Sequence, residues 1–333
     1  MSELPIRPLP FAQRLRYSAE SVPFFLFMGL FKILGIDAAS AVGSFIGRHV
    51  FYRLPPARTA RTNLRAAYPD MSAPEIEKTV REVCDNLGRV VAEYPHLDKL
   101  ALGGPGARIE MDGVENGNAA VASAKGVMFI SGHFANWETM PVAASLLGYD
   151  GGLVYRPPNN PYVDRWISRQ RAKLGPKEQI SKGVQGTRRI FTLLRRGKAI
   201  FLLVDQKTGE GISVPFFGRG AMTTAAPAML ALKLGSILLP ASAERVGGAH
   251  FRVKIHPPIE FAPSGDYDQD VPALTAKITE TIEAIVRERP SQWLWIHHRW
   301  PRARDVVKKA KKRNGQDLGG SGVSVEREGS SLT

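Results

Sequence analysis

The sequence predicts an α/β protein with a mixed, mostly parallel central sheet that is covered by helices on both faces. Two uninterrupted apolar runs, 126–130 and 199–204, have the length and composition of strands buried on both faces. Helical patterns lie between and after these runs, and such alternation is typical of a sheet enclosed by helices. A chain of 333 residues with 44% hydrophobic residues can bury a core of this size.

The first region, 1–36, is predicted to be helical and to associate with a membrane. Its apolar run, 21–36, is rich in phenylalanine, is interrupted by Lys32 and follows Arg14 and Arg16. The run is shorter than the ~20 residues of a straight spanning helix. We expect it to lie in the headgroup region, with a marginal span or a core helix as the alternatives. No secretory cleavage pattern follows it.

The main domain is predicted to cover residues 37–301, and its first part, 37–100, is helical. Ser72-Ala-Pro-Glu75 has the pattern of a capping box, and the helix that it opens carries its apolar residues on one face. A loop rich in glycine at 103–106 marks the change to the α/β part, 107–301.

Strands and helices alternate in the α/β part. Strands are expected at 126–130, 153–155, 199–204, 237–239 and 251–255. A turn and then a helix that ends at 147–148 are expected after the first of these strands, and further helices at 160–174, 184–194, 225–234 and about 271–288.

The charge is concentrated in two places. The net charge is +14, and the block 156–198 is strongly basic, with only Asp164 and Glu178 opposing it. Such a field attracts a polyanion, although a solvated basic face would have the same composition. The tail, 302–333, is basic and rich in glycine and serine, which predicts disorder and either a membrane tether or a solubilising role.

The only cysteine excludes several classes of protein. Cys84 cannot form an internal disulfide framework or a cysteine-based metal cluster by itself. It lies in a helical pattern, where a small buried side chain is expected.

The segment 126–138 carries the residues best suited to chemistry. His133 follows a buried strand and the Ser131-Gly132 turn, and ligand sites form at the carboxyl edge of parallel strands. Residues five apart do not share one face of a helix, so Glu138 can meet His133 only if the histidine precedes the helix. We then expect Glu138 to accept an imidazole N–H and to raise the basicity of the other nitrogen.

His133 has other interpretations. A zinc-binding His-Glu-x-x-His helix and a Gly-x-Ser-x-Gly nucleophile turn are both excluded by the order of the residues. A structural histidine at the end of a strand stays open on this motif alone.

The motif His133-Phe-Ala-Asn-Trp-Glu138 resembles the His-x4-Asp/Glu motif of glycerolipid acyltransferases, and most closely the late acyltransferases of lipid A biosynthesis (the lauroyl/myristoyl, HtrB-like branch). The likeness extends over nearly all of 20–301, although Ala135 and His298 stand where that family usually has glycine and arginine. The further matching blocks are Asn63-Leu-Arg-Ala-Ala-Tyr-Pro-Asp70, Val154-Tyr-Arg-Pro157, Asn160-Pro161 with Arg171, Asp205-Gln206, Val214-Pro-Phe-Phe-Gly218, Thr223-Thr224 and Trp295-Ile-His-His-Arg299.

The resemblance implies transfer of an acyl chain from acyl carrier protein to a hydroxyl on an acyl chain of a lipid A precursor. His133 would be the general base and Glu138 its orienting carboxylate. The thioester is already activated, so neither a metal nor another cofactor is expected. The family also implies a place on the inner membrane, with the catalytic domain on the cytoplasmic face. Substrate-binding roles would fall to Arg156, Arg171, Asp205 and Asn136, of which Asp205 would orient an arginine or a substrate hydroxyl or would cap the following turn.

Two alternatives stay open. The acceptor could be a glycerophospholipid or a mannosylated phosphoinositide, since the motif is shared by other lipid acyltransferases. A basic nucleic-acid-binding protein is the alternative from another class, but the sequence has no zinc finger, aromatic RNA-binding signature or recognition helix, so no nucleic-acid partner is expected.

Overall fold

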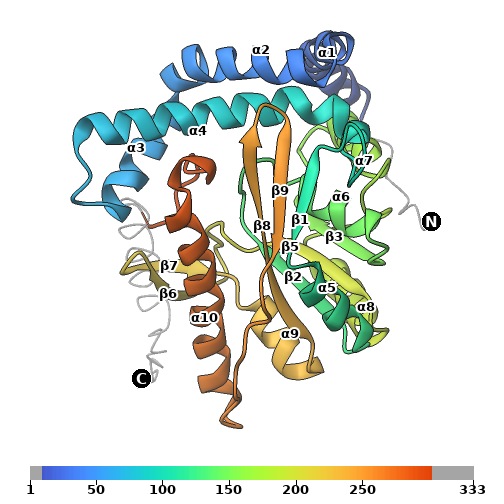
Figure 1. Cartoon of the computed structure of the whole chain (residues 1–333), viewed down its shortest axis with the longest axis vertical. Coiled ribbons are helices and arrows are strands. Elements are labelled where there is room, and N and C mark those ends of the chain that lie inside the picture. The colour runs from blue at the N-terminus through green and yellow to red at the C-terminus, as the bar shows by residue number, and fades with distance from the viewer. Residues whose placement is uncertain (1–9, 302–333) are drawn as a thin grey trace, which may run out of the picture.

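A central sheet organises the computed structural model, which describes residues 10–301 (Figure 1). Within these residues the sheet has seven strands in the order β1-β9-β8-β2-β5-β3-β4. The strands from β8 to β4 run parallel, while β9 is antiparallel to β8 and pairs in parallel with β1. The predicted mixed, mostly parallel sheet is therefore confirmed. Its strands are β1 (Ile109–Asp112), β2 (Val127–Ser131), β3 (Gly151–Tyr155), β4 (Glu178–Ser181), β5 (Ala199–Leu203), β8 (Ile237–Gly247) and β9 (His250–Ile255).

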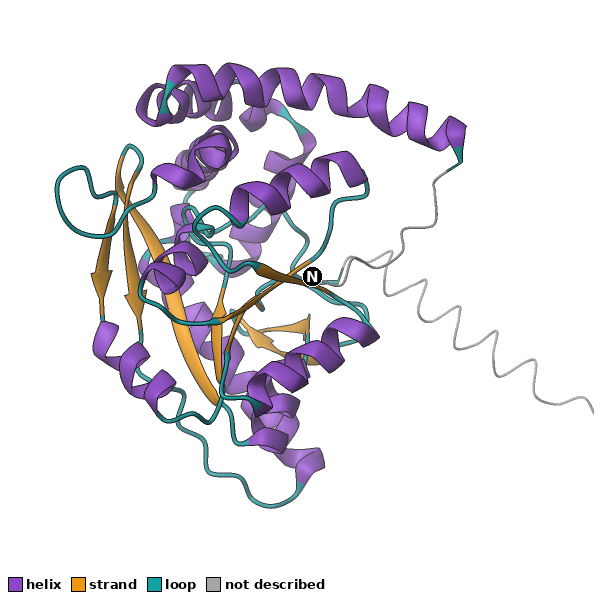
Figure 2. Ribbon diagram, turned by 90° about the vertical axis from the view of Figure 1, so that its right-hand side faces the viewer, coloured by secondary structure: helices purple, strands orange, loops and turns teal. Residues whose placement is uncertain are grey.

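Helices cover both faces of this sheet (Figure 2). One face packs against α5 (Val114–Ala122) and α6 (Thr139–Leu146), and the other against α8 (Val184–Arg195), α9 (Ala226–Leu234) and α10 (Tyr267–Glu288). Helical layers cover both faces of β2, and all five of its residues are buried. This burial explains why its sequence is continuously apolar rather than alternating.

A helical layer lies across the top of the sheet in Figure 1. It consists of α1 (Phe11–Leu34), α2 (Ile36–His49), α3 (Pro55–Ala67) and α4 (Ala73–Glu93), followed by the short helix η2 (Tyr94–Lys99). The predicted capping box forms at Ser72 and Glu75. A Cβ on Gly43 of α2 would lie 2.4 Å from the carbonyl oxygen of Gly88, so glycine is required for the close approach of α2 and α4.

The remaining elements connect these layers. They are the short helices η1 (Phe51–Arg53) and η3 (Pro290–Gln292), helix α7 (Pro161–Arg171), and the hairpin of β6 (Ile212–Phe216) and β7 (Arg219–Thr223).

Several elements differ from the sequence prediction. The short edge strands β1 and β4, helix α5 and the β6–β7 hairpin were missed. Edge strands have one strand neighbour and more solvent contact, so β1 and β4 contain polar residues and lack a long apolar run. Helix α1 begins at Phe11, well before the apolar run. The predicted tail, 302–333, lies outside the described residues.

Candidate active site

A cavity of about 1140 Å³ lies at the carboxyl edge of β2, β5 and β3. Strand β3 pairs with β5 only as far as Leu153, opposite Phe201. Beyond this pair the two strands separate, and Val154 and Leu202 both face the cavity. Most of the deep wall is apolar, contributed by residues such as Met111, Met128, Met140, Leu230, Val253 and Ile255.

His133 lies on the wall of this cavity, and the sheet register explains its partner. Ser131 at the end of β2 pairs with Leu203 at the end of β5. Two residues further along each chain stand His133 and Asp205, and the imidazole Nδ1 lies 2.8 Å from Asp205 Oδ1. The backbone N–H of His133 also donates to Asp205 Oδ2 at 2.8 Å.

These contacts fix the tautomer of His133. An ionised carboxylate only accepts hydrogen bonds, so Nδ1 carries the proton and Nε2 is the basic nitrogen. The amide Nε2 of Gln206 lies 3.3 Å from the imidazole Nε2, and both side chains line the cavity. The ring of Trp137 packs edge-on against the imidazole with its centroid 5.0 Å away. His133 therefore has the geometry of a general base.

Asp205 is ionised in this setting. Burial by itself raises the pKa of Asp205, but the facing imidazole and the hydrogen bonds from His133 and Trp293 more than offset it, so its pKa falls to about 2. The indole Nε1 of Trp293 donates to Asp205 Oδ2 at 2.8 Å. A fixed negative charge thus lies behind the imidazole at all physiological pH values.

Glu138 lies elsewhere on the same cavity, with different partners. It immediately precedes α6, and its Oε1 and Oε2 accept hydrogen bonds from Arg171 Nη2 at 2.6 Å and Nε at 2.9 Å. The hydroxyl of Tyr94 donates to Glu138 as well. Burial raises the pKa of Glu138, but the charge and hydrogen bonds of Arg171 lower it by more. The pKa of Glu138 therefore lies below its usual value.

The predicted hydrogen bond between Glu138 and His133 does not form. Both imidazole nitrogens have other partners, Asp205 and Gln206, and the orienting carboxylate is Asp205. The reason is that the neighbouring strand β5 delivers Asp205 in register with His133, while the turn before α6 directs Glu138 toward Arg171.

The other predicted site residues divide into two groups. Arg171 lines the cavity, and Arg156 lies on it as an exposed side chain just after β3. Asn136 is 1% exposed and does not line the cavity; its Nδ2 donates to Glu93, and its Oδ1 accepts from the backbone of Glu138. Asn136 therefore supports the loop rather than facing a substrate.

Three residues of the site were not assigned a role from the sequence. Gln206 could have been found, since it follows the apolar strand at the same edge as His133. Tyr94 and Trp293 carry no local signal, because they reach the two carboxylates from segments that are distant in the sequence.

The cavity therefore places a basic imidazole and a guanidinium beside a large apolar space, which suits reactions on long acyl chains. Residues 10–302 match the family model described as bacterial lipid A biosynthesis acyltransferase. The chain belongs to this family. As a member, it is an acyltransferase of lipid A biosynthesis.

Curated relatives agree with the family. The chain is 28% identical over 251 residues to a lipid A biosynthesis palmitoleoyltransferase of Escherichia coli (strain K12), covering 72% of this chain and 77% of the relative. It is 27% identical over 255 residues to the lipid A biosynthesis lauroyltransferase of the same organism, covering 73% and 78%. A lipid A biosynthesis acyltransferase of Haemophilus influenzae (strain ATCC 51907 / DSM 11121 / KW20 / Rd) is 26% identical over 253 residues, covering 73% and 77%.

Proposed function

We propose that this acyltransferase moves an acyl chain from the thioester of acyl carrier protein to a hydroxyl on an acyl chain of a lipid A precursor, with His133 as the general base. The observation that carries the proposal is the position of the imidazole Nε2 on the cavity, while Nδ1 is held by the buried Asp205.

The chemistry follows from that geometry. His133 Nε2 takes the proton of the acceptor hydroxyl as its oxygen attacks the thioester carbonyl. Asp205 stabilises the imidazolium that forms. When the tetrahedral intermediate collapses, the C–S bond breaks, and the imidazolium returns the proton to the departing thiolate. The sequence-based pairing of His133 with Glu138 is replaced here by the pairing with Asp205.

Glu138 has a separate task in this proposal. It holds the guanidinium of Arg171 at the cavity wall, and Arg171 also lies over the ring of Tyr155 with 5.5 Å to the centroid. A guanidinium fixed in this way can stabilise a developing oxyanion or bind a phosphate of the acceptor. Arg156, which is exposed on the cavity, is suited to the same acidic substrate.

The test is acyl transfer by the purified enzyme with acyl carrier protein thioester and a lipid A precursor. Losing a positioned base costs roughly 10²–10⁴-fold in rate, and we expect that loss for His133→Ala. Unchanged turnover in this variant would remove His133 from the mechanism. Turnover with a glycerophospholipid alone would overturn the lipid A acceptor.

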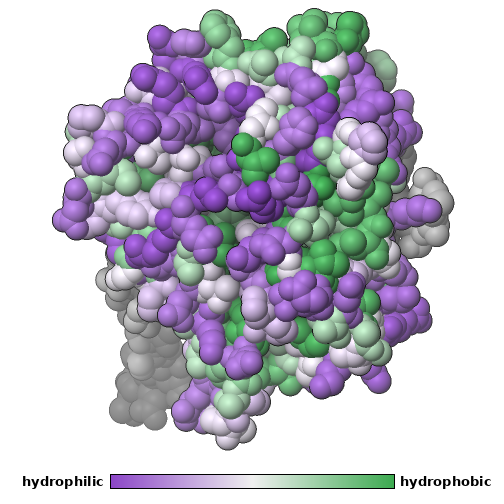
Figure 3. All heavy atoms as spheres, in the orientation of Figure 1, coloured by the Kyte–Doolittle hydropathy of each residue, from purple (hydrophilic) through white to green (hydrophobic). Residues whose placement is uncertain are grey.

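We also propose that α1 and α2 place the enzyme on the cytoplasmic face of the inner membrane. Helix α1 has the length and hydropathy of a membrane span, with 24 residues and 17% of its apolar window buried. The most exposed large hydrophobic residues of the two helices include Leu26 at 71%, Ile33 at 85% and Phe45 at 63%. Figure 3 shows hydrophobic residues gathered along the edge of the molecule where α1 and α2 lie. An apolar edge of this kind is suited to lipid.

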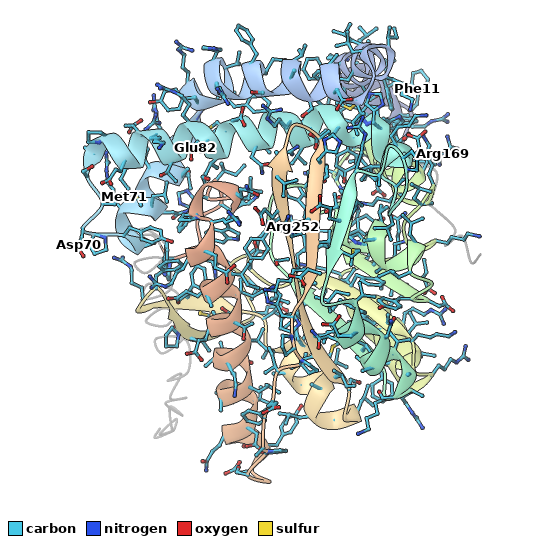
Figure 4. The ribbon with its side chains drawn as sticks, in the orientation of Figure 1. Phe11, Asp70, Met71, Glu82, Arg169 and Arg252 are labelled. Carbon is cyan, nitrogen blue, oxygen red and sulfur yellow. The ribbon has the colours of Figure 1, made fainter. Side chains whose placement is uncertain are left out.

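Contacts along α1 favour an in-plane orientation over a span. Asn160 donates to the carbonyl of Tyr17, the rings of Phe24 and Trp166 pack edge-on, and Lys32 donates to the carbonyl of Pro95. Figure 4 shows Phe11, at the start of α1, and Arg169 of α7 at the same corner of the molecule, and the two helices are in contact. Since these contacts extend over most of α1, a crossing of the bilayer would break them.

Vesicle binding tests this proposal. Charge added on the apolar edge by Leu26→Glu with Phe45→Glu is expected to release the protein from vesicles of anionic phospholipid, while Met229→Glu on the distant helix α9 is not. Equal retention of both variants would contradict the assignment of this edge. Protease cleavage of a C-terminal tag from outside sealed right-side-out vesicles would overturn the cytoplasmic orientation.

A further inference from the structure

The loop 132–138 between β2 and α6 carries both His133 and Glu138, and its backbone is strained. Ala135 has a φ of 44°, in the left-handed region that residues other than glycine rarely adopt. Such a conformation costs on the order of 1–3 kcal/mol and persists only when its surroundings impose it. Something outside the loop must therefore hold it in place.

Hydrogen bonds hold the loop from two sides. On one side, Asn86 of α4 donates from Nδ2 to the carbonyl of Ala135 at 2.9 Å, and Asn136 donates to Glu93 Oε2 at 2.9 Å. On the other side, the backbone N–H of Ala135 donates to the carbonyl of Gln292 at 2.8 Å. The strained residue is thus bound at both its N–H and its carbonyl.

Arg245 joins the groups on both sides, with its guanidinium on one side and its backbone on the other. Arg245, near the end of β8, donates from Nε to Asn86 Oδ1 at 3.0 Å and from Nη2 to Glu93 Oε2 at 3.0 Å. Its backbone N–H donates to Gln292 Oε1 at 2.8 Å, and the Gln292 amide donates back to the Arg245 carbonyl at 3.1 Å. Each of the three residues that hold the loop is therefore itself bound to Arg245.

The ion pair between Arg245 and Glu93 is buried. The side chains of Arg245 and Glu93 are 8% and 1% exposed, and neither residue lines the cavity. Removing one member of a buried pair leaves an uncompensated charge, so breaking this contact is strongly unfavourable. Arg61 and Glu77 provide a contrast, because their ion pair joins α3 to α4 and is 21% and 36% exposed.

We infer that the Arg245–Glu93 ion pair, acting through Asn86 and Asn136, is the positioning element that fixes the catalytic loop 132–138, while the backbone of Arg245 holds Gln292 on the other side of the loop. Arg245 and Glu93 are positioning residues, since they act on His133 and Glu138 only through the loop. Catalytic groups must be held to within about 0.5 Å by such supporting contacts, and a displacement of 1 Å can cost on the order of 100-fold in rate.

The test compares Arg245→Lys and Asn86→Ala with the matched control Arg61→Lys. Lysine keeps the charge of Arg245 but cannot reach Asn86 and both oxygens of Glu93 in the planar geometry of a guanidinium. Asn86→Ala removes the contact to Ala135 without leaving a charge in the loop, and it keeps the test valid if Arg245→Lys does not fold. Each folded variant is examined by amide hydrogen exchange and by steady-state kinetics.

We expect both Arg245→Lys and Asn86→Ala to exchange the amides of 133–138 about 5- to 10-fold faster than the wild type, since one lost hydrogen bond is worth about 1–1.5 kcal/mol. We also expect kcat to fall roughly 10–100-fold with KM nearly unchanged. Arg61→Lys is expected to change neither the exchange of this loop nor kcat.

The steady-state kinetics rest on the proposed function, whereas the amide hydrogen exchange of the loop does not. If the wild-type enzyme failed to acylate the lipid A precursor, the proposed function would fall, and loop exchange alone would decide the role of Arg245. Unchanged loop exchange in both Arg245→Lys and Asn86→Ala would overturn the inference. Faster exchange with an unchanged kcat would also overturn it, because the loop would then not need to be held for catalysis.

Discussion

Two buried carboxylates lie at the active site, Glu138 on the cavity wall and Asp205 behind the imidazole of His133, and their different partners lead us to expect different tasks. Asp205 is 3% exposed and Glu138 is 2% exposed. Asp205 accepts from the imidazole of His133 and the indole of Trp293, whereas Glu138 accepts from the guanidinium of Arg171 and the phenol of Tyr94. Burial and ionisation are alike in the two groups. The two carboxylates differ in the side chain to which each is hydrogen-bonded, and we expect this difference to decide their roles.

The difference lies in which partner can lose its proton. An imidazole exchanges a proton near neutral pH, so the carboxylate beside it can stabilise the imidazolium that forms during proton transfer. A guanidinium stays charged, so the carboxylate beside it can only position and neutralise it. We therefore expect the carboxylate after β5, Asp205, to support proton transfer by His133, and the carboxylate before α6, Glu138, to position Arg171.

The largest expected effect is that of Asp205→Asn. The amide can turn its N–H toward Nδ1 and favour the wrong tautomer, and the matching change in a serine protease triad costs about 10⁴ in kcat. We expect a fall of roughly 10³–10⁴-fold in kcat with little change in KM, measured in the acyl-transfer assay. Glu138→Gln serves as the isosteric control, and an equal loss in that variant would remove the distinction between the two carboxylates.

Glu138→Gln should act mainly on stability and on Arg171. Breaking a buried ion pair costs about 3–5 kcal/mol, because the remaining charge has no partner. We expect a clear loss of unfolding free energy in chemical denaturation and a smaller loss of kcat than for Asp205→Asn. Adding Arg171→Met should restore part of the stability but not the activity. Failure of the double variant to regain stability would show that the ion pair is not the source of the effect.

The next largest expected effect is the contribution of ionised Asp205 to the pH dependence of stability. Its pKa of about 2 lies below the unfolded value of about 3.9, so its contribution is present above pH 4 and is lost as the pH falls toward 2. A shift of this size is worth about 2–3 kcal/mol. We expect Tm to fall between about pH 4 and pH 2, and Asp205→Asn to flatten part of that fall. A slope unchanged by the substitution would mean that other carboxylates cause it.

Tyr94→Phe should have the smallest effect. It removes one hydrogen bond to Glu138 and one from Arg171, which lies 3.0 Å from the phenol oxygen, but it leaves the ion pair intact. Net contributions of this kind are about 1–2 kcal/mol. We expect a lower Tm and a change of a few-fold in kcat/KM. A loss as large as that of Asp205→Asn would place the phenol in the chemistry.

The sequence alone determined the layers of this fold and one half of its active site. Continuous apolar runs at 126–130 and 199–204 predicted the buried strands β2 and β5, because a strand covered on both faces has no polar side. His133 was found because it follows such a strand at the edge where parallel sheets form their sites.

The tertiary structure alone decided which groups His133 and Glu138 meet. No local pattern states that β5 lies next to β2 with Ser131 opposite Leu203, and this register is what brings Asp205 to the imidazole. In the same way, α7 supplies Arg171 to Glu138, and β8 supplies Arg245 to Asn86 and Glu93, which hold the loop 132–138. Periodicity reports the face that an element buries, whereas the neighbours of that face depend on how distant elements pack together.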